Sequence, residues 1–420
     1  MKRIIVILLF IILILGGAFA YSEYQSRRLP DSPAVADAQE AAMQDPAEVP
    51  AEAASTAAEA VSESETGATA TGGLQMDQMD YETLKIDQLF ATRSPEETVL
   101  TINGKAENWG DYFYFLSSQV DHVENMLVQL YANYGAELLW SDTADGEGNT
   151  YADLAVDGAE NNMLRLAAIE AFADEHKVEL TEESRAALAQ QLELDIKSFC
   201  GEDATEADFE QDLAARHLSR ALYDRINTDN MLYQEGLWKL YGENGEAVGE
   251  EAALQYLKDN GYVSANHILL MTVDPVTGEK LDDAAIADKT ATAKRLAEEL
   301  QRRFAQLKEE FCEDSGKTVY AAGYTFTPHT MVAEFENACK ELDNYEVSDP
   351  VLSSYGYHII MKLPPDADAL LFSRSSEPVT ARVAVATAEY GELLQTCMDG
   401  LKVEYAEGFE KPNLLDYIKD

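Results

Sequence analysis

Two short aliphatic runs, each directly preceded by a histidine, place the strongest constraint on the fold of this chain. They read "NHILL" at 266–270 and "YHIIM" at 357–361. Both are short and rich in β-branched or aliphatic residues, which is typical of buried strands. Between them lie a long amphipathic helical pattern over 283–311 and a second one around "TMVAEFENACKEL". This succession predicts an α+β domain over 258–365, in which each histidine is most simply a core residue satisfied by one hydrogen bond.

The preceding segment, 81–257, has the spacing of a mostly α-helical domain. It opens with "VLTING", a strand-like stretch that ends on the turn signal Asn103-Gly104. Apolar residues then recur at helical intervals, and Thr205 with Asp208 has the form of a capping box at a helix start. Apolar stripes of this kind form cores far more often than ligand sites, so we assign no chemistry to this domain.

The first eighty residues read as a targeting segment and a tether. Residues 1–20 begin with Lys2 and Arg3, continue with an aliphatic run and end in small residues at Ala20, which is typical of a signal peptide or an N-terminal membrane anchor. Residues 21–80 are rich in Ala, Glu, Ser and Pro and poor in large apolar residues. Such a stretch cannot offset the entropy of ordering, which predicts a disordered linker.

The C-terminal segment, 366–420, returns to a helical pattern. The simplest arrangement has it packing back on 81–257, so that 258–365 is an insertion in a discontinuous domain; a free C-terminal helix is the alternative. A disulfide between Cys200 and Cys397 would tie the tail down, but four free cysteines fit the sequence equally well.

Charge and composition restrict the partners. The formal net charge of −46, from 77 acidic and 31 basic residues, repels phosphate backbones, so we expect no nucleic-acid partner. The spacing of His, Cys and carboxylate residues indicates no metal site, and no cofactor is expected. A solute-binding protein is disfavoured because the repeated alternation of strands and helices is missing.

Residues 261–364 resemble the parvulin-type peptidyl-prolyl isomerases. Four blocks carry the resemblance in the family's order: "ANHILL", "FCEDS", "FTPHTMVAEFENA" and "VSDPVLSSYGYHII". The resemblance implies a four-stranded antiparallel sheet with surrounding helices. More loosely, "VLTINGKAENWGDYFYFL" is similar to the start of the helical chaperone domain in secreted foldases of the PrsA and SurA type.

The same resemblance implies a set of site residues. His267 and His358 would lie beside each other near the centre of the sheet, Asp314 would match the family's acid, and Ser353 would match its hydroxyl residue. The proline pocket would consist of Met331 and Phe335, one helical turn apart, with Phe326 as a further aromatic. We expect the pocket and Asp314 to carry most of the catalytic effect, and the histidines to be structural and electrostatic members of the network.

Two departures from the family pattern bear on activity. Many members have a Gly-Gly-Asp-Leu-Gly block before the pocket aromatic, whereas this chain has "YAAGYTF" at 320–326. Phosphate-directed members have a basic cluster after the first strand, but "TVDPVTGEKLDDAAIADK" is mainly acidic, so a preference for phosphorylated residues before proline is not expected.

These observations predict an extracytoplasmic foldase that isomerises X-Pro bonds in unfolded or partly folded exported proteins and also acts as a chaperone. The N-terminal segment would engage the membrane or the export machinery, either as an anchor or as a signal cleaved near Ala20. The alternative is a holding chaperone whose parvulin domain is catalytically inert.

Overall fold

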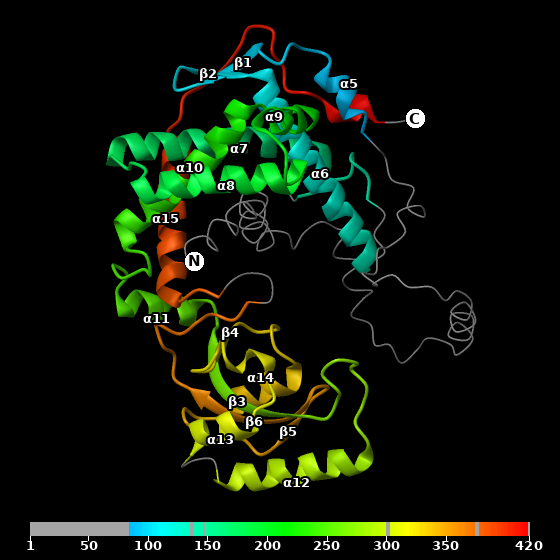
Figure 1. Ribbon diagram of the computed structural model, residues 1–420, viewed down its shortest axis with the longest axis vertical. Helices are drawn as coiled ribbons and strands as arrows, with labels where there is room; N and C mark the ends of the chain where they lie inside the picture. Colours follow the sequence, from blue (N-terminus) through cyan, green and yellow to red (C-terminus); the bar gives the residue numbers. More distant parts are fainter. Residues whose placement is uncertain (1–83, 135–137, 146–147, 300–302, 374–377, 419–420) are drawn as a thin grey trace, which may run out of the picture. The chain divides into compact units, whose positions relative to one another are not determined.

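A computed structural model describes residues 84–418, except 135–137, 146–147, 300–302 and 374–377 (Figure 1). The predicted signal segment and linker therefore lie outside the described residues. Within the described ranges, no helix combines the length and the apolar composition needed to cross a bilayer. The described residues divide into two compact units, 84–233 with 394–418, and Gln234–Leu393. The divisions thus fall at 233 and 393 rather than at the predicted 257 and 365.

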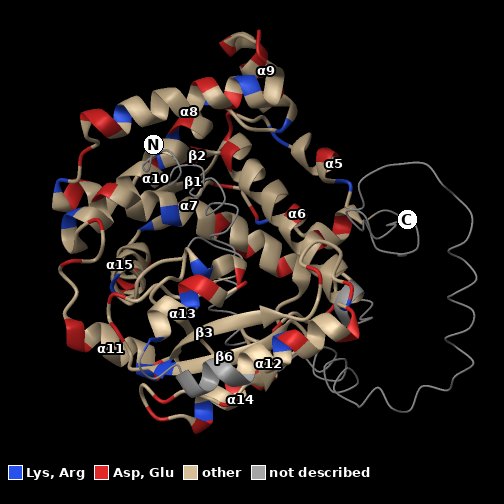
Figure 2. Ribbon diagram, turned by 60° about the horizontal axis from the view of Figure 1, so that its bottom comes forward, with Lys and Arg blue, Asp and Glu red and all other residues tan. Residues whose placement is uncertain are grey.

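The first unit is mainly helical and contains a small sheet. Its elements are α5 (Ile86–Phe90), β1 (Thr98–Ile102), β2 (Lys105–Asn108), α6 (Trp109–Tyr134), α7 (Tyr151–His176), α8 (Glu182–Cys200), α9 (Glu206–Ala215), most of α10 (Arg220–Tyr241), β7 (Val403–Tyr405) and the 3-10 helix η5 (Leu414–Tyr417). The capping box predicted at Thr205 and Asp208 is present at the start of α9. Acidic residues outnumber basic ones along α8 and α9 (Figure 2).

The sheet of this unit joins the two ends of the described chain. Its order is β2-β1-β7, and both pairings are antiparallel, with Leu100 opposite Tyr405. Asn103 and Gly104 turn β1 into β2 with positive φ angles of 49° and 80°, the conformation that this dipeptide favours. The prediction of a wholly helical C-terminal segment was wrong, because β7 gains backbone hydrogen bonds only by pairing with a strand far away in sequence.

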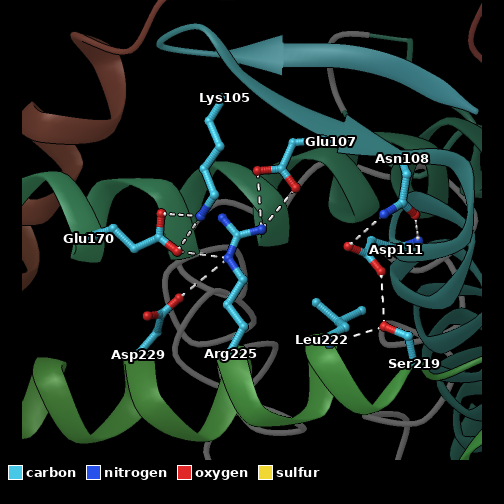
Figure 3. A network of polar contacts seen from close by, with 9 residues as sticks. All are labelled: Lys105, Glu107, Asn108, Asp111, Glu170, Ser219, Leu222, Arg225 and Asp229. Atoms are coloured by element: carbon cyan, nitrogen blue, oxygen red, sulfur yellow. Dashed lines mark hydrogen bonds and ion pairs between the residues drawn. The ribbon is translucent and has the colours of Figure 1, made fainter. Parts of the chain in front are cut away.

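A partly buried network of charged residues connects this sheet to two helices (Figure 3). Arg225 of α10 donates from Nη1 to Glu107 of β2 at 2.8 Å and from Nε to Glu170 of α7 at 2.8 Å. Lys105 of β2 binds the same Glu170 at 2.9 Å. Asp229, one turn along α10, lies with Oδ2 3.7 Å from Nε of Arg225. The network therefore ties β2, α7 and α10 together through charge-assisted hydrogen bonds.

The second unit holds the strands that carry the two histidines. Its elements are the end of α10, then α11 (Glu250–Asp259), β3 (Val263–Met271), α12 (Asp283–Glu299), α13 (Phe304–Phe311), the 3-10 helix η4 (Ser315–Lys317), β4 (Tyr324–Phe326), α14 (Ala333–Glu341), β5 (Val351–Leu352), β6 (Gly356–Leu363) and most of α15 (Ala381–Asp399). The strands form one antiparallel sheet in the order β4-β3-β6-β5, which confirms the predicted four-stranded sheet. The single long helix predicted over 283–311 is instead two helices, α12 and α13.

The two faces of this sheet have separate apolar cores. On one face, Ile268, Leu270 and Ile359 pack with Ala293 of α12 and Leu307 of α13. On the other face, side chains from the sheet pack against α14; this second cluster includes Ala265, Phe326, Phe335, Cys339 and Ile360. Because residues alternate between faces along a strand, His267 and His358 both belong to the face that α14 covers.

A segment after the predicted domain end also belongs to this unit. Leu371 forms a parallel bridge with Thr325, and the amide of Phe372 donates to the carbonyl of Thr325 at 2.7 Å. These contacts cover the outer edge of β4. The sequence predicts that 366–420 packs on the helical domain; its later part, which contains β7, lies in the first unit, whereas its first part completes the sheet of the second unit.

Candidate functional site

The two strand histidines meet on the α14 face of the sheet. His267 lies opposite Ile360 and His358 lies opposite Leu269, so the two histidines are diagonal neighbours rather than directly paired. Their rings are 5.3 Å apart between centroids, and their Nδ1 atoms lie 3.4 Å apart. Both side chains are buried. The sequence thus brings two titratable rings into one hydrogen bond at the centre of an apolar sheet.

Asp314 closes one end of this group. It follows α13 and caps η4, where its Oδ1 accepts the amide of Gly316 at 3.0 Å. Its Oδ2 lies 3.1 Å from Nε2 of His267 and also accepts the hydroxyl of Tyr324. Burial by itself would raise the pKa of Asp314, but the hydrogen bonds from His267, Tyr324 and Gly316 lower it well below its ordinary value. This carboxylate is therefore ionised at every working pH.

Ser353 closes the other end. Its Oγ lies 2.7 Å from Nε2 of His358 and accepts the amide of Tyr355 at 3.1 Å. Burial, with a smaller contribution from the neighbouring His267, lowers the pKa of His358 to about 3. His358 is therefore neutral near pH 7.

These contacts determine the direction of the proton chain. An ionised Asp314 only accepts, so Nε2 of His267 carries a proton, and when the ring carries only that proton its Nδ1 atom is an acceptor. Nδ1 of His358 must donate to it, which leaves Nε2 of His358 to accept the hydroxyl proton of Ser353. Three side chains, Ser353, His358 and His267, thus donate in one direction toward the Asp314 carboxylate, and each bond polarises the next.

The apolar side chains of Phe326, Met331 and Phe335, together called the slot, border this chain. The ring of Phe335 meets those of His267 and His358 edge-on, at 5.2 and 5.5 Å between centroids, and that of Phe326 at 5.7 Å. Met331 is half-buried in the same cluster. The structure therefore brings all seven residues of the predicted site together on one face.

The helical-turn spacing predicted for Met331 and Phe335 was wrong. Helix α14 begins at Ala333, and Val332 at its N-cap has an extended conformation. Met331 lies before the helix, where its amide donates to the side chain of the buried Glu336 at 3.0 Å. This bond satisfies an amide beside the helix start and turns the chain so that Met331 still reaches the slot.

Tyr324 joins the site without having been predicted. It lies in the "YAAGYTF" loop, which the sequence marked only as a departure from the family pattern. The spacing of Tyr324 could have predicted its place in the site. It lies two residues before Phe326 on a strand, so its side chain projects from the same face. That its hydroxyl reaches Asp314 depends on the tertiary structure.

The cysteines and possible metal ligands add nothing to this site. All four cysteines are free thiols, so the conjectured Cys200–Cys397 disulfide is absent. Cys312 is a buried packing residue, and its Sγ lies 3.5 Å from the amide nitrogen of Leu269. Among the described residues, no group of three or more His, Cys, Asp or Glu side chains is arranged to hold a metal ion.

Comparisons with known proteins agree with this geometry. Residues 267–363 match the Rotamase family model, the PPIC-type PPIASE domain. Foldase protein PrsA of Oceanobacillus iheyensis is 26% identical over 214 residues, 50% of this chain and 61% of that protein. Foldase protein PrsA 1 of Bacillus cereus is 46% identical over 74 residues, 17% of this chain and 26% of that protein. Chaperone SurA of Chromohalobacter salexigens is 39% identical over 75 residues, 16% of this chain and 17% of that protein.

The matches cover only part of each relative, since the chain spans 26% and 61% of the length of the two PrsA proteins. Within that part, the match to 267–363 coincides with the sheet and the polar chain described above. The resemblance to parvulin-type isomerases is confirmed for this segment, and half of the chain is similar to a foldase of the PrsA type.

Proposed function

We propose that this protein is an extracytoplasmic foldase that catalyses cis–trans isomerisation of X-Pro bonds in exported proteins and also acts as a chaperone. The observation that carries the proposal is the buried chain from Ser353 to Asp314, which borders an apolar slot inside a segment that matches the PPIC-type PPIASE domain. Neither feature alone would define an isomerase site.

The chemistry needs no covalent step. An amide bond resists rotation with a barrier of about 18–20 kcal/mol because resonance keeps it planar. A proline ring held by Phe335, Phe326 and Met331 would bring its amide out of water, which favours the twisted state with its weaker carbonyl dipole. In this proposal His267 and His358 form a rigid polar floor, and Asp314 supplies a fixed negative charge beside the rotating amide.

Chaperone activity is assigned to the first unit. Leu194 and Phe199 of α8 are 41% and 51% exposed, on a helix rich in acidic residues. Exposed apolar side chains can hold unfolded segments, and a high negative charge would keep such a complex soluble. Clients would be proline-containing polypeptides that have crossed the membrane, with residues 1–20 serving as a signal cleaved near Ala20 or as an anchor.

A protease-coupled assay on an Ala-X-Pro-Phe peptide tests the enzymatic part. We expect turnover by the full chain and a loss of about 10- to 100-fold in kcat/KM for Asp314→Ala, since a hydrogen bond to a charged group is worth about 1.5–3 kcal/mol. Phe335→Ala should lose a comparable amount because it opens the slot. Glu310→Ala and Tyr345→Ala, at exposed positions of the same unit, serve as matched controls.

Suppression of client aggregation tests the chaperone part separately. Asp314→Ala should retain it, because the first unit is unchanged. If the intact protein suppresses aggregation but shows no turnover, the isomerase proposal fails, and the protein is a holding chaperone with an inert domain. The mass of the protein recovered from its cell envelope distinguishes a cleaved signal from a retained anchor.

A further inference from the structure

The loop at 320–326, where this chain departs from the common family block, is firmly held. Lys308 of α13 is buried, and its Nζ donates to the carbonyls of Tyr320 and Ala321 at 3.1 and 3.0 Å. Asn266 of β3 donates to the carbonyl of Ala322 at 3.3 Å. Three successive carbonyls of the loop are thus satisfied by side chains from the second unit, so the loop has one defined path.

This path fixes the ring of Tyr324. The ring stacks on Tyr320 with centroids 4.5 Å apart and planes 29° apart, and Phe372 meets it edge-on at 5.4 Å. Tyr324 is 5% exposed. A phenol held on two sides by aromatic rings has little freedom to turn its hydroxyl away from the carboxylate that it contacts.

A glycine provides the space for that hydroxyl. A Cβ atom on Gly316 would lie 2.1 Å from the hydroxyl oxygen of Tyr324 and 3.3 Å from its Cζ. The φ angle of Gly316 is not in the left-handed region, so alanine would be acceptable for the backbone here. The requirement for glycine is therefore space for the Tyr324 hydroxyl beside Asp314.

We propose that Tyr324 is a positioning residue for Asp314 and, through it, for His267, an inference that rests on the proposed isomerase function. Oδ1 of Asp314 accepts a hydrogen bond from the amide of Gly316. Its Oδ2 accepts hydrogen bonds from the hydroxyl of Tyr324 and from Nε2 of His267. Removing any one of these donors would free the carboxylate to rotate. The Gly-Gly-Asp-Leu-Gly block common in the family contains no hydroxyl, so the "YAAGYTF" loop adds a donor that this block lacks.

The charge state of Tyr324 suits this role. Burial, together with the neighbouring Asp314 carboxylate, raises the pKa of Tyr324 above its ordinary value. The phenol therefore stays protonated and remains a donor at every working pH. Asp314 in turn stays a pure acceptor, which is what keeps the proton of His267 on Nε2.

Tyr324→Phe tests the proposal because it removes one oxygen and keeps the ring. We expect kcat/KM for the prolyl peptide to fall about 3- to 10-fold, in line with the loss of one hydrogen bond. The pKa of the Asp314 carboxyl, followed by NMR, should also rise, since a donor to its charged form is lost. Tyr357→Phe is the matched control, because Tyr357 precedes His358 on β6 and faces the opposite side of the sheet.

Gly316→Ala gives an independent test through a double-mutant cycle. Alone, it should lower kcat/KM at least as much as Tyr324→Phe, because the added methyl group displaces the hydroxyl. In the Tyr324→Phe background it should have little further effect, since the clashing oxygen is gone. Additive effects, or a Tyr324→Phe variant with wild-type kcat/KM and an unchanged pKa of Asp314, would overturn the proposal.

Failure of the isomerase proposal would look different. If the intact protein shows no turnover, the pKa of Asp314 can still be compared between wild type and Tyr324→Phe, by following the NMR signal of the Asp314 carboxyl carbon against pH. An upward shift in the variant supports the positioning role without any assay of activity. Identical titrations reject that role whatever the activity of the intact protein.

Discussion

Each unit of the protein contains a carboxylate that is partly or fully buried, and the pKa values of the two carboxylates shift in opposite directions. Asp314 in the second unit accepts hydrogen bonds from His267, Tyr324 and Gly316, and its pKa is lowered. Asp229 in the first unit is 2% exposed, and its Oδ2 receives no hydrogen bond from any residue that the structure describes. Burial, with the nearby Glu170, raises the pKa of Asp229 to about 7.

The difference shows that donors, rather than depth, decide the ionisation of a buried acid. The network around Asp229 contains two cations, Lys105 and Arg225, and three carboxylates, Glu107, Glu170 and Asp229. Its formal charge is therefore 2 − 3 = −1, and a proton on Asp229 makes it neutral. The protonated form can donate to Glu170, so the proton replaces the donor that Asp229 lacks.

The largest effect is expected from removing the cation shared by the first network. Arg225→Met leaves Glu107, Glu170 and Asp229 beside an apolar side chain, with Lys105 as the remaining cation of the network. We expect the free energy of unfolding of the first unit to fall by about 3–5 kcal/mol, the usual result of breaking a buried ion pair from one side. Urea unfolding followed by tryptophan fluorescence measures this loss.

The chain offers a clean probe and a matched control for this experiment. Trp109 and Trp140 lie in the first unit and Trp238 lies in the second, so a Trp238→Phe background reports on the first unit alone. Arg220→Met removes a cation five residues earlier on α10, where its partners Asp224 and Glu206 are exposed. That change should cost less than about 1 kcal/mol. Equal losses for Arg220 and Arg225 would mean that burial adds nothing to the network.

A smaller, pH-dependent effect is expected for Asp229→Asn. The ordinary pKa of this carboxyl is 3.8, and the folded value is about 7. Between these values folding takes up a proton, so the free energy of unfolding falls as pH rises from about 4 to 7 and stays low above that range. Asparagine cannot titrate, so the free energy of unfolding of the variant relative to wild type should be about 2–3 kcal/mol higher at pH 8 than at pH 5. Urea titrations at both pH values test this prediction. If the free energy of unfolding changes equally with pH in both proteins, the raised pKa assigned to Asp229 is wrong.

The smallest expected response concerns His358, which should remain neutral. The lowered pKa of this ring means that the unfolded chain binds its proton below about 6.5 while the folded protein does not. Its contribution to stability is therefore present at neutral pH and lost as pH falls toward 3, the opposite sign to that of Asp229. Long-range ¹H–¹⁵N spectra between pH 5 and 8 should show a neutral His358 with the proton on Nδ1. Protonation in this range, or a proton on Nε2, would refute the proton chain drawn here.

Much of the second unit was predictable because its signals are local. The aliphatic runs around His267 and His358 predicted strands, and the resemblance that they carry placed Asp314 and Ser353 near them. What failed there was also instructive. Helix α13 begins at Phe304, and no proline or glycine in "RLAEELQRRFAQL" predicts this separate start. Met331 lies before α14, where its amide donates to the side chain of Glu336.

The first unit was harder to predict because its sheet is assembled from distant parts of the chain. Strand β7 is three residues long, and "VEY" carries no pattern that distinguishes it from a loop. Its partner β1 lies roughly three hundred residues earlier. Pairings of this kind are decided by the backbone groups of both strands together, which neither segment reveals alone.

Sequence by itself determined most element types, the acidic charge and the residue types of the site, since helical and strand periodicities and caps act over a few neighbours. Tertiary structure alone decided which acid is ionised, which histidine nitrogen carries the proton, and why residue 316 must be glycine. The physical reason is that each of these depends on hydrogen-bond donors and open space supplied by residues far apart in the chain. Asp314 accepts hydrogen bonds from three donors, whereas Oδ2 of Asp229 lies 3.7 Å from an arginine that also pairs with Glu107 and Glu170.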